Sequence, residues 1–272
     1  MSSHNSTLKT LIVATLLCIV CATLVSSISV ALKERQLINK DIDKKRNILL
    51  CAGLIEKKAK ADEVKAAFEK VTPKIVDLQT GEIRENFNPY TGEKDEKFNP
   101  EMYDQLKASK NPALNTKVEN DKGSQIKARA KYALIYLVKK DDKVTQVILP
   151  IKSYGLWSTM LGFLALDTAD TSTIKGFAYY SHGETPGLGG EVDNPKWKGQ
   201  WPGKKAFNEN WKPAIHVIKG KVNPEQKDSE YKIDGLSGAT ITSNGISTSL
   251  DYWLSESGFG LFLSNIREKG FQ

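Results

Sequence analysis

The sequence contains few of the residues from which metal centres and disulfide scaffolds are built. Its 272 residues include three cysteines and three histidines, and the histidines are far apart along the chain. Cys18 and Cys21 fall inside an apolar run, which leaves Cys51 as the one cysteine of the remaining sequence. One thiol cannot form a disulfide within that part, and three cannot make a four-cysteine metal site. We therefore expect neither a disulfide framework nor a metal site.

The common signatures of nucleotide and hydrolase sites are also missing. The sequence has no Walker P-loop, no H-E-x-x-H and no G-x-S-x-G. Gly187-Leu188-Gly189-Gly190 is rich in glycine but lacks the G-x-G-x-x-G spacing of a dinucleotide fingerprint. The sequence therefore predicts no NTPase, no self-contained hydrolase and no NADH site.

The charge of the chain says little about its function. There are 39 Lys and Arg against 32 Asp and Glu, which gives a formal net charge of +7. The lysines are mixed with acids, as in segment 57–63, and no zinc-finger, helix-turn-helix or RNP signature accompanies them. This pattern is typical of a solvated surface near anionic lipid, and we expect no nucleic-acid partner.

One long apolar run lies near the start of the chain. Leu11–Leu32 has 22 residues and no charge, and as a helix it would be about 33 Å long, enough to cross a bilayer. A signal peptide cleaved near Ser29-Val30-Ala31 is the alternative, but a signal core is usually about 7–15 residues long. We expect an uncleaved transmembrane helix at 11–32 after a short tail at 1–10. Basic residues after the span favour a cytoplasmic domain, but this rule is weak for large domains, so the residues leave the side open.

The region that follows the span, residues 33–129, is expected to be helical, irregular and close to the membrane. Apolar periodicity predicts helices at 32–51 and 62–70 and a short strand at 75–78. The stretch 82–127 is polar, contains three prolines and shows little periodicity, so we expect a long excursion that is partly helical near 102–106.

Residues 130–272 are expected to form one domain. The fold class that the whole pattern predicts is α+β: a transmembrane helix followed by an antiparallel sheet with flanking helices. A charged turn at 139–143 between two apolar runs predicts a hairpin. The expected strands are 133–138, 144–149, 161–166, 174–180 and 214–218, and the expected helices are 242–255 and 259–269.

The first segment that could form a functional site is Asp234-Gly235-Leu236-Ser237-Gly238-Ala239-Thr240-Ile241-Thr242. Its glycines allow a tight turn, and a helix that begins near Thr242 or Ser243 would add the positive end of its dipole. Such a turn can hold a phosphate beside the hydroxyl of Thr240. An ordinary helix cap by Thr242 or Ser243 is the alternative, but the string D-x-x-S-G-A-T is rare by chance.

The second segment is the loop His182–Glu191, which contains four glycines and a proline. A simple connecting turn is one interpretation. The other is a shaped loop whose glycines admit a flat ring close to the backbone. Polar contacts would then come from Glu184 and Thr185 and an apolar contact from Leu188, with His182 left as a loop residue. The candidate residues of this loop are Glu184, Thr185, Gly187, Leu188 and Gly189.

Tryptophans supply further candidates. We expect Trp197, Trp201 and Trp211 to form a cluster in the core or at a subunit interface, because large aromatics are usually buried. Packing near an aromatic ligand is the alternative. Leu156 and Trp157, next to Gly155, are further candidates for packing against such a ligand.

The two segments together with the N-terminal span resemble the C subunit of the sodium-translocating NADH:quinone reductase, a covalent-FMN family. The resemblance covers nearly the whole chain, and the polar stretch 82–123 matches least. The G subunit of Rnf-type electron-transport complexes is a related alternative, but it is typically shorter. A non-redox anchored scaffold domain is the other alternative, in which both segments are only structural.

The resemblance implies a cofactor and an attachment site. In this family a separate flavin transferase esterifies the phosphate of FMN onto the last Thr of the motif, which is Thr240 here. Asp234, Ser237, Gly238 and Ala239 match the rest of the motif, and Thr242 lies just beyond it. We expect Asp234 to be recognised by the transferase, although a flavin contact or a turn residue are alternatives.

The resemblance also implies a place in a larger machine. The chain would be an electron-transfer subunit, without the NADH site, of a complex of six subunits in the bacterial inner membrane. That complex passes electrons from NADH to ubiquinone and exports sodium. Its partners would be the other subunits, the flavin transferase during maturation and the lipid bilayer. The family places this domain on the periplasmic side.

Overall fold

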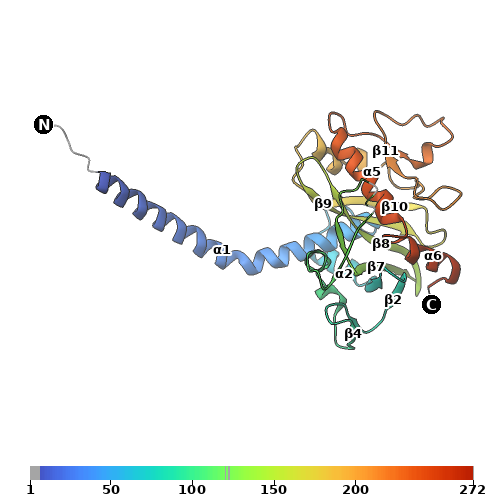
Figure 1. Ribbon diagram of the computed structural model, residues 1–272, viewed down its shortest axis with the longest axis horizontal. Helices are drawn as coiled ribbons and strands as arrows, with labels where there is room; N and C mark the ends of the chain where they lie inside the picture. Colours follow the sequence, from blue (N-terminus) through green and yellow to red (C-terminus); the bar gives the residue numbers. More distant parts are fainter. Residues whose placement is uncertain (1–6, 120, 122, 272) are drawn as a thin grey trace. The chain divides into compact units, whose positions relative to one another are not determined.

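The computed structural model describes residues 7–119, 121 and 123–271 (Figure 1). The chain divides into two compact units between Lys44 and Lys45. The described part of the first unit is helical, residues 7–44 of helix α1 (Thr7–Cys51), and an 18-residue window of this helix reaches a mean hydropathy of 2.6 with no buried residue. The length and composition of α1 therefore suit a membrane span.

Helix α1 is longer than the sequence predicts. The expected helices at 11–32 and 32–51 are one continuous helix, and residues 7–10 of the expected tail are also helical. Residues 1–6 of that tail lie outside the described residues. The last turn of α1 belongs to the second unit, where Ile48, Leu49 and Cys51 are buried.

The second unit is built on a six-stranded antiparallel sheet, which confirms the predicted fold class. The strand order is β10-β9-β8-β7-β1-β2, and neighbouring strands pair antiparallel throughout. The predicted hairpin and the second strand pair are both present. The strands are β1 (Val71–Asp77), β2 (Glu82–Arg84), β7 (Tyr132–Lys140), β8 (Lys143–Tyr154), β9 (Thr159–Asp167) and β10 (Ile174–Ser181).

Strand β1 lies inside this sheet, although it comes from the region that the sequence analysis placed outside the domain at 130–272. It pairs with β7 from Val71 opposite Val138 to Asp77 opposite Tyr132. Ile75 and Val76 of β1 are buried in the core. Residues 71–84 therefore belong to the same sheet as residues 132–181.

Short elements connect the sheet to its surroundings. Helix α2 precedes β1, and the polar excursion between β2 and β7 contains short strands, a 3-10 turn and one helix. After β10 come short segments and two longer helices, α5 and α6. The bounds are α2 (Ala61–Phe68), β3 (Phe87–Asn88), β4 (Glu93–Lys94), η1 (Pro100–Met102), α3 (Gln105–Lys110), β5 (Asn115–Lys117), β6 (Ala128–Ala130), η2 (Gly189–Asp193), α4 (Pro195–Lys198), β11 (His216–Val217), η3 (Ser229–Tyr231), β12 (Lys232–Ile233), α5 (Thr240–Leu254) and α6 (Gly260–Lys269).

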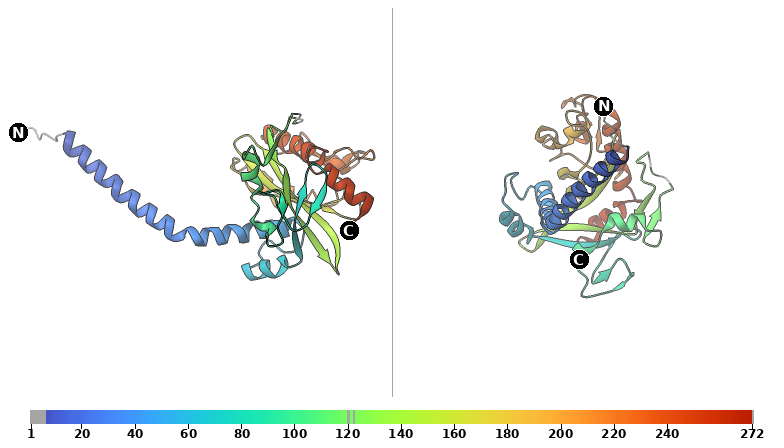
Figure 2. Two further views of the ribbon diagram at one scale, coloured as in Figure 1. Left: turned by 60° about the horizontal axis from the view of Figure 1, so that its bottom comes forward. Right: turned by 90° about the vertical axis from the view of Figure 1, so that its left-hand side faces the viewer.

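Helix α5 packs directly on strand β8, on one side of the sheet (Figure 2). Gly245 makes the close approach possible, because a Cβ there would overlap the carbonyl oxygen of Tyr154. Nearer the end of the helix, the indole Nε1 of Trp253 donates to the carbonyl of Lys152 at 2.8 Å. The contact with β8 fixes α5 along its length and hence the position of its first turn.

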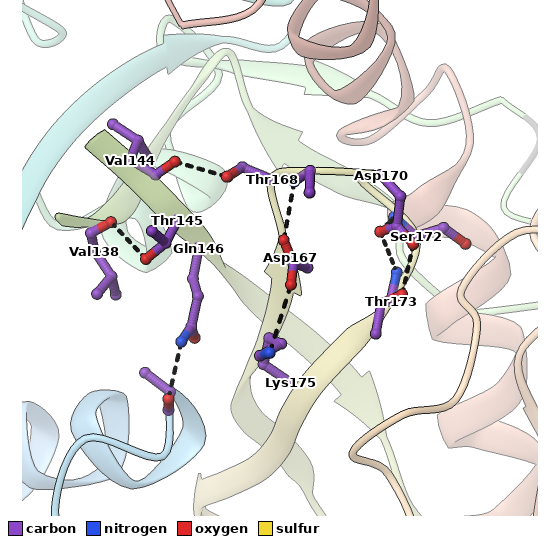
Figure 3. A network of polar contacts seen from close by, with 12 residues as sticks. Val138, Val144, Thr145, Gln146, Asp167, Thr168, Asp170, Ser172, Thr173 and Lys175 are labelled. Carbon is purple, nitrogen blue, oxygen red and sulfur yellow. Dashed lines mark hydrogen bonds and ion pairs between the residues drawn. The ribbon is translucent and has the colours of Figure 1, made fainter. Parts of the chain in front are cut away.

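A polar network joins the start of β8, the end of β9 and the start of β10 (Figure 3). Thr168 Oγ1 donates to the carbonyl of Val144 at 2.7 Å, and Lys175 forms an ion pair of 3.4 Å with Asp167. Asp170 accepts the backbone N–H of Thr173 at 2.8 Å. These contacts order the loop between β9 and β10.

The predicted tryptophan cluster is correct for two of its three members. Trp197 and Trp201 are buried, and their ring centroids are 5.4 Å apart. Trp211 is 43% exposed and lies instead under Arg267, whose guanidinium is 3.8 Å from the ring centroid. Trp211 is therefore outside the core cluster. Residue type alone does not distinguish a core aromatic from one on a surface loop, and the other expected place of Trp211, a subunit interface, stays a prediction.

Candidate functional site

The turn that leads into α5 separates buried from exposed side chains. Leu236 and Ala239 are 6% and 7% exposed, whereas Ser237, Gly238 and Thr240 face solvent. Gly238 has a φ of 70°, a backbone conformation that side chains other than glycine rarely adopt. The hydroxyl of Thr240 is therefore presented at the surface by a turn that is anchored in the core.

Helix α5 begins at Thr240, two residues earlier than the sequence predicts. Its N-cap is Ala239, which has no side chain able to accept a hydrogen bond, so the alternative interpretation, an ordinary cap by Thr242 or Ser243, is wrong. Thr242 and Ser243 are buried inside the helix. Thr242 Oγ1 donates to Glu184, and Ser243 Oγ accepts the N–H of Leu236 at 3.1 Å.

The uncapped start of α5 gives the site its electrostatic character. The first N–H groups of an α-helix have no carbonyl partner within the helix, and at α5 the cap residue Ala239 offers them no side-chain acceptor, although its carbonyl accepts the N–H of Ser243 at 3.0 Å. These groups carry the positive end of the helix dipole. An anionic group held near Thr240 would meet backbone donors, which is the usual way in which helix N-termini bind phosphate.

Glu184 is the organising side chain beneath this turn. Its carboxylate accepts five hydrogen bonds although the residue is only 6% exposed. Thr242 Oγ1 donates at 2.7 Å, and four further donors come from the turn between β8 and β9. Those four donors are Leu156 N at 3.1 Å, Trp157 N at 2.9 Å, Ser158 N at 3.0 Å and Ser158 Oγ at 3.1 Å.

These hydrogen bonds keep Glu184 ionised. Burial alone would raise the pKa of the carboxyl group, but the bonds from Thr242, Trp157, Leu156 and Ser158 lower it below its ordinary value. The sequence analysis proposed Glu184 as a polar contact of the ligand. In the structure its carboxylate joins the glycine loop, the 155–158 turn and α5, so it organises the backbone around the site.

Glycines pack tightly around this carboxylate. A Cβ on Gly155 would lie 2.5 Å from the Glu184 carboxylate, and one on Gly189 would lie 2.7 Å from Glu184 Oε2 and 2.9 Å from Thr242 Oγ1. Gly189 is thus required by the packing of Glu184 and Thr242. The glycine-rich composition of this loop therefore has a physical reason that does not depend on a ligand.

The outer part of the glycine loop is exposed. Thr185, Gly187 and Leu188 face solvent, and the carbonyl of Thr185 accepts the N–H of Gly190 at 2.9 Å. Leu188 reaches the turn that leads into α5, because a Cβ on Gly238 would lie 2.9 Å from Leu188 Cδ2. The two segments that the sequence analysis singled out are therefore in contact.

His182 supports the loop rather than facing the turn. Its Nε2 lies 2.9 Å from Asp193 Oδ2, and its Nδ1 accepts the N–H of Glu184 at 3.2 Å. These contacts agree with the expectation that His182 is a structural loop residue.

Exposed apolar side chains are concentrated around this region. Leu156 is 50% exposed, Trp157 71%, Leu188 44% and Ile241 55%. They come from the 155–158 turn, the glycine loop and the first turn of α5, three segments joined through Glu184 and Gly238. We call these four residues the apolar rim. Its exposure is consistent with a surface that a ligand or another protein covers.

The sequence analysis missed two residues that shape the site. Ser158 Oγ donates to Glu184 and accepts the N–H of Gly183 at 2.8 Å, so it links two loops. Ser243 ties α5 back to the turn that precedes it. The only sequence signal for Ser158 was its place after two apolar residues in a turn, and Ser243 was named only as one possible cap in the alternative interpretation.

Comparison with known proteins identifies the family. Residues 155–255, which include the apolar rim and Thr240, match the FMN-binding domain family. The C subunit of the Na(+)-translocating NADH-quinone reductase of Pseudomonas aeruginosa is 44% identical over 270 residues, 98% of this chain and 99% of that protein. The corresponding C subunit of Vibrio vulnificus is 42% identical over 271 residues, 99% of each chain.

A solved structure supports the same assignment. The crystal structure of Shewanella oneidensis NqrC superimposes with a TM-score of 0.74 at 30% identity and covers 85% of this chain and 100% of that one. The chain therefore belongs to the family formed by the C subunits of the Na(+)-translocating NADH-quinone reductases, an oxidoreductase complex, and it contains an FMN-binding domain.

Proposed function

We propose that this protein holds one FMN covalently linked through its phosphate to Oγ1 of Thr240 and relays electrons from NADH toward ubiquinone. The observation that carries the proposal is the uncapped first turn of α5, which begins at an exposed threonine. Formation of the link would join Thr240 Oγ1 to the phosphorus of FMN with the net loss of one water. The phosphate would then lie at the positive end of α5, where backbone N–H groups can bind its oxygens.

Thr240 fits this role better than the neighbouring Thr242. Thr242 is 1% exposed, and its hydroxyl is already used to donate to Glu184. A transferase could reach that hydroxyl only after the first turn of α5 had unfolded. The exposed hydroxyl of Thr240 needs no such rearrangement.

The residues around Thr240 suit a flat, partly apolar cofactor. Bound FMN supplies the redox chemistry, which amino-acid side chains cannot provide. The apolar rim would exclude water from the ring, and Glu184 would keep the three rim segments together. The Leu156–Trp157 pair and the glycine loop residues Thr185, Gly187 and Leu188 are the residues that we expect to lie nearest the ring.

The same proposal includes the cellular setting. Helix α1 would anchor the protein in the bacterial inner membrane, with the sheet domain in the periplasm and the other five of the six subunits as neighbours. Electron transfer through the complex would be coupled to sodium export. The length and hydropathy of α1 support the anchor, and the relatives support the complex.

The attachment is tested with the full chain co-expressed with a flavin transferase. We expect the intact mass of the wild-type chain to rise by FMN less one water, and its band to fluoresce in a denaturing gel. Thr240→Ala should lose both signals, and Thr240→Ser should keep them because the hydroxyl remains. Thr242→Val should also keep them, since this variant removes the hydroxyl of the buried threonine only.

Two outcomes would contradict the proposal. Flavin on Thr240→Ala together with its loss from Thr242→Val would move the attachment to Thr242. The second outcome is a wild-type chain that gains no mass, although the same transferase loads a known flavin acceptor. That result would support a scaffold domain without a redox role.

A further inference from the structure

Asp234, the first residue of the attachment motif, is bound to the protein through its backbone N–H, its backbone carbonyl and one carboxylate oxygen. Its N–H donates to Gln200 Oε1 at 3.0 Å, and its carbonyl accepts Trp197 Nε1 at 2.9 Å. Its carboxylate Oδ1 accepts the N–H of Val222 at 2.7 Å. Gln200 and Trp197 lie 34 and 37 residues before Asp234 in the sequence, so the contacts tie three segments together.

We propose that Asp234 is a positioning residue that fixes the turn presenting Thr240, and that the flavin transferase does not recognise the negative charge of Asp234. The surface that the transferase recognises is then the exposed part of the motif, Ser237, Gly238 and Thr240. This inference rests on the proposed attachment at Thr240. It differs from the expectation, drawn from the motif alone, that Asp234 is itself a recognition element.

The residue after Asp234 continues the anchoring. The N–H of Gly235 donates to the carbonyl of Gly220 at 2.8 Å, and a Cβ on Gly235 would collide with the carbonyl oxygen of Ile218. The bond from Val222 to Asp234 closes the other side of the same loop. Segment 218–222 and the start of the motif therefore hold each other in place.

The constraint passes from this anchor to helix α5. Leu236 is buried, and its N–H donates to Ser243 Oγ, a side chain of α5. The N–H of Ala239 then closes the turn by donating to the carbonyl of Leu236 at 3.0 Å. The motif thus has an anchored set of residues, Asp234, Leu236 and Ala239. Their contacts determine the positions of the exposed residues Ser237, Gly238 and Thr240.

The chemistry of the Val222 contact gives a way to separate positioning from recognition. A backbone N–H can be satisfied by the oxygen of an amide as well as by a carboxylate. Asp234→Asn therefore keeps the acceptor for Val222 and removes the negative charge, whereas Asp234→Ala removes both. Trp197→Phe and Gln200→Ala remove the other two contacts of Asp234 and leave the motif itself unchanged. A transferase that recognises only the residues of the motif should load these two variants at the wild-type rate.

The experiment measures the initial rate of flavin loading of the purified full chain in detergent by a flavin transferase, followed by intact mass. We expect Asp234→Ala to load about tenfold more slowly, the effect of losing one hydrogen bond that orders the reacting turn. Asp234→Asn should load within about twofold of wild type. Trp197→Phe and Gln200→Ala should each slow loading severalfold.

Thermal unfolding of every variant is recorded alongside, and loading is compared at a temperature where all of them are folded. Ser237→Ala is the matched outward variant: it should slow loading without changing the unfolding temperature. If Asp234→Ala unfolds at a lower temperature but loads flavin at the wild-type rate, Asp234 stabilises the fold without positioning the turn. That result would overturn the inference.

Two further results would also overturn it. Asp234→Asn loading as slowly as Asp234→Ala would mean that the transferase requires the carboxylate. Wild-type loading rates in both Trp197→Phe and Gln200→Ala would mean that the anchoring is not needed. Thr240→Ala is assayed in parallel, and flavin on that variant would contradict the proposed attachment site independently of the Asp234 results.

Discussion

The hydroxyl of Thr242 donates to Glu184 Oε2 at 2.7 Å, and both side chains are buried although they are 58 residues apart in sequence. This bond connects the first turn of α5 to the glycine loop. Through the other oxygen of the same carboxylate, the connection extends to the turn between β8 and β9. The surface around Thr240 is thus assembled on one buried negative charge.

Removal of that charge is expected to destabilise the domain strongly. Glu184→Ala would leave five donors without their acceptor, so we expect the free energy of unfolding to fall by about 3 kcal/mol or more. Urea unfolding of the detergent-solubilised chain, followed by tryptophan fluorescence, measures this change. Glu209→Ala, at an exposed position, is the control and should change little. A loss below about 1 kcal/mol would show that the network contributes little to stability.

The same carboxylate predicts how stability depends on pH. The pKa of Glu184 in the folded protein lies below its ordinary value of 4.5, so its ionised form stabilises the fold. This contribution is complete above pH 4.5 and is lost as the pH falls through the lowered pKa. The difference in unfolding free energy between wild type and Glu184→Gln should therefore be large at neutral pH and shrink as the pH is lowered below 4.5. A difference that stays constant down to acid unfolding would contradict the assignment.

Close packing of α5 on β8 gives a third prediction. Gly245→Ala would place a methyl group on the carbonyl oxygen of Tyr154, which belongs to the backbone and cannot rotate away. We expect a loss of about 2–3 kcal/mol in unfolding free energy, typical of overpacking. Gly183→Ala serves as the comparison, since its methyl would be 3.4 Å from Ser158 Cβ, an ordinary contact. Equal stability of the two variants would show that α5 can shift on the sheet.

Cys51 is expected to resist thiol reagents in the folded protein. It is 2% exposed, and its Sγ donates to the carbonyl of Phe163 at 3.2 Å. In a Cys18→Ser/Cys21→Ser chain, maleimide should add no mass until urea unfolds the domain. Rapid labelling under native conditions would mean that the last turn of α1 opens readily.

The burial of Cys51 also decides how the membrane side can be measured. A silent native cysteine allows an exposed reporter, such as Glu225→Cys, to be introduced into the same background. We expect a membrane-impermeant reagent to label this reporter from the periplasmic face of the membrane. Labelling from the cytoplasmic face alone would reverse the proposed orientation.

The sequence predicted what depends on local pattern. The hairpin of β7 and β8, the strand pair β9 and β10, and the helices near 242–255 and 259–269 follow from periodicity, and all are present. The start of α5 was misplaced because threonine and serine are common caps, whereas the actual cap is Ala239. Propensity could not reveal that Thr242 is needed as a donor to Glu184 inside the fold.

Long-range pairing accounts for the other differences. Strand β1 joins β7 across the intervening residues 78–131, which are largely polar, and no local signal indicates which strand it pairs with. The inward contacts of Asp234 come from Gln200, Trp197 and Val222, none of which belongs to the motif. A motif identifies which residues matter, but only the fold tells which of them face the core.

The alanine at the start of α5 has a consequence for maturation. A helix whose first turn lacks a side-chain acceptor is incomplete as synthesised, and on the proposed chemistry the phosphate ester at Thr240 supplies the missing cap. Cofactor insertion would then stabilise the first turn of a helix that already begins at Thr240 without the flavin. A protein that has not received its flavin would differ from a finished one in local order as well as in colour, which gives assembly a physical basis for telling the two apart.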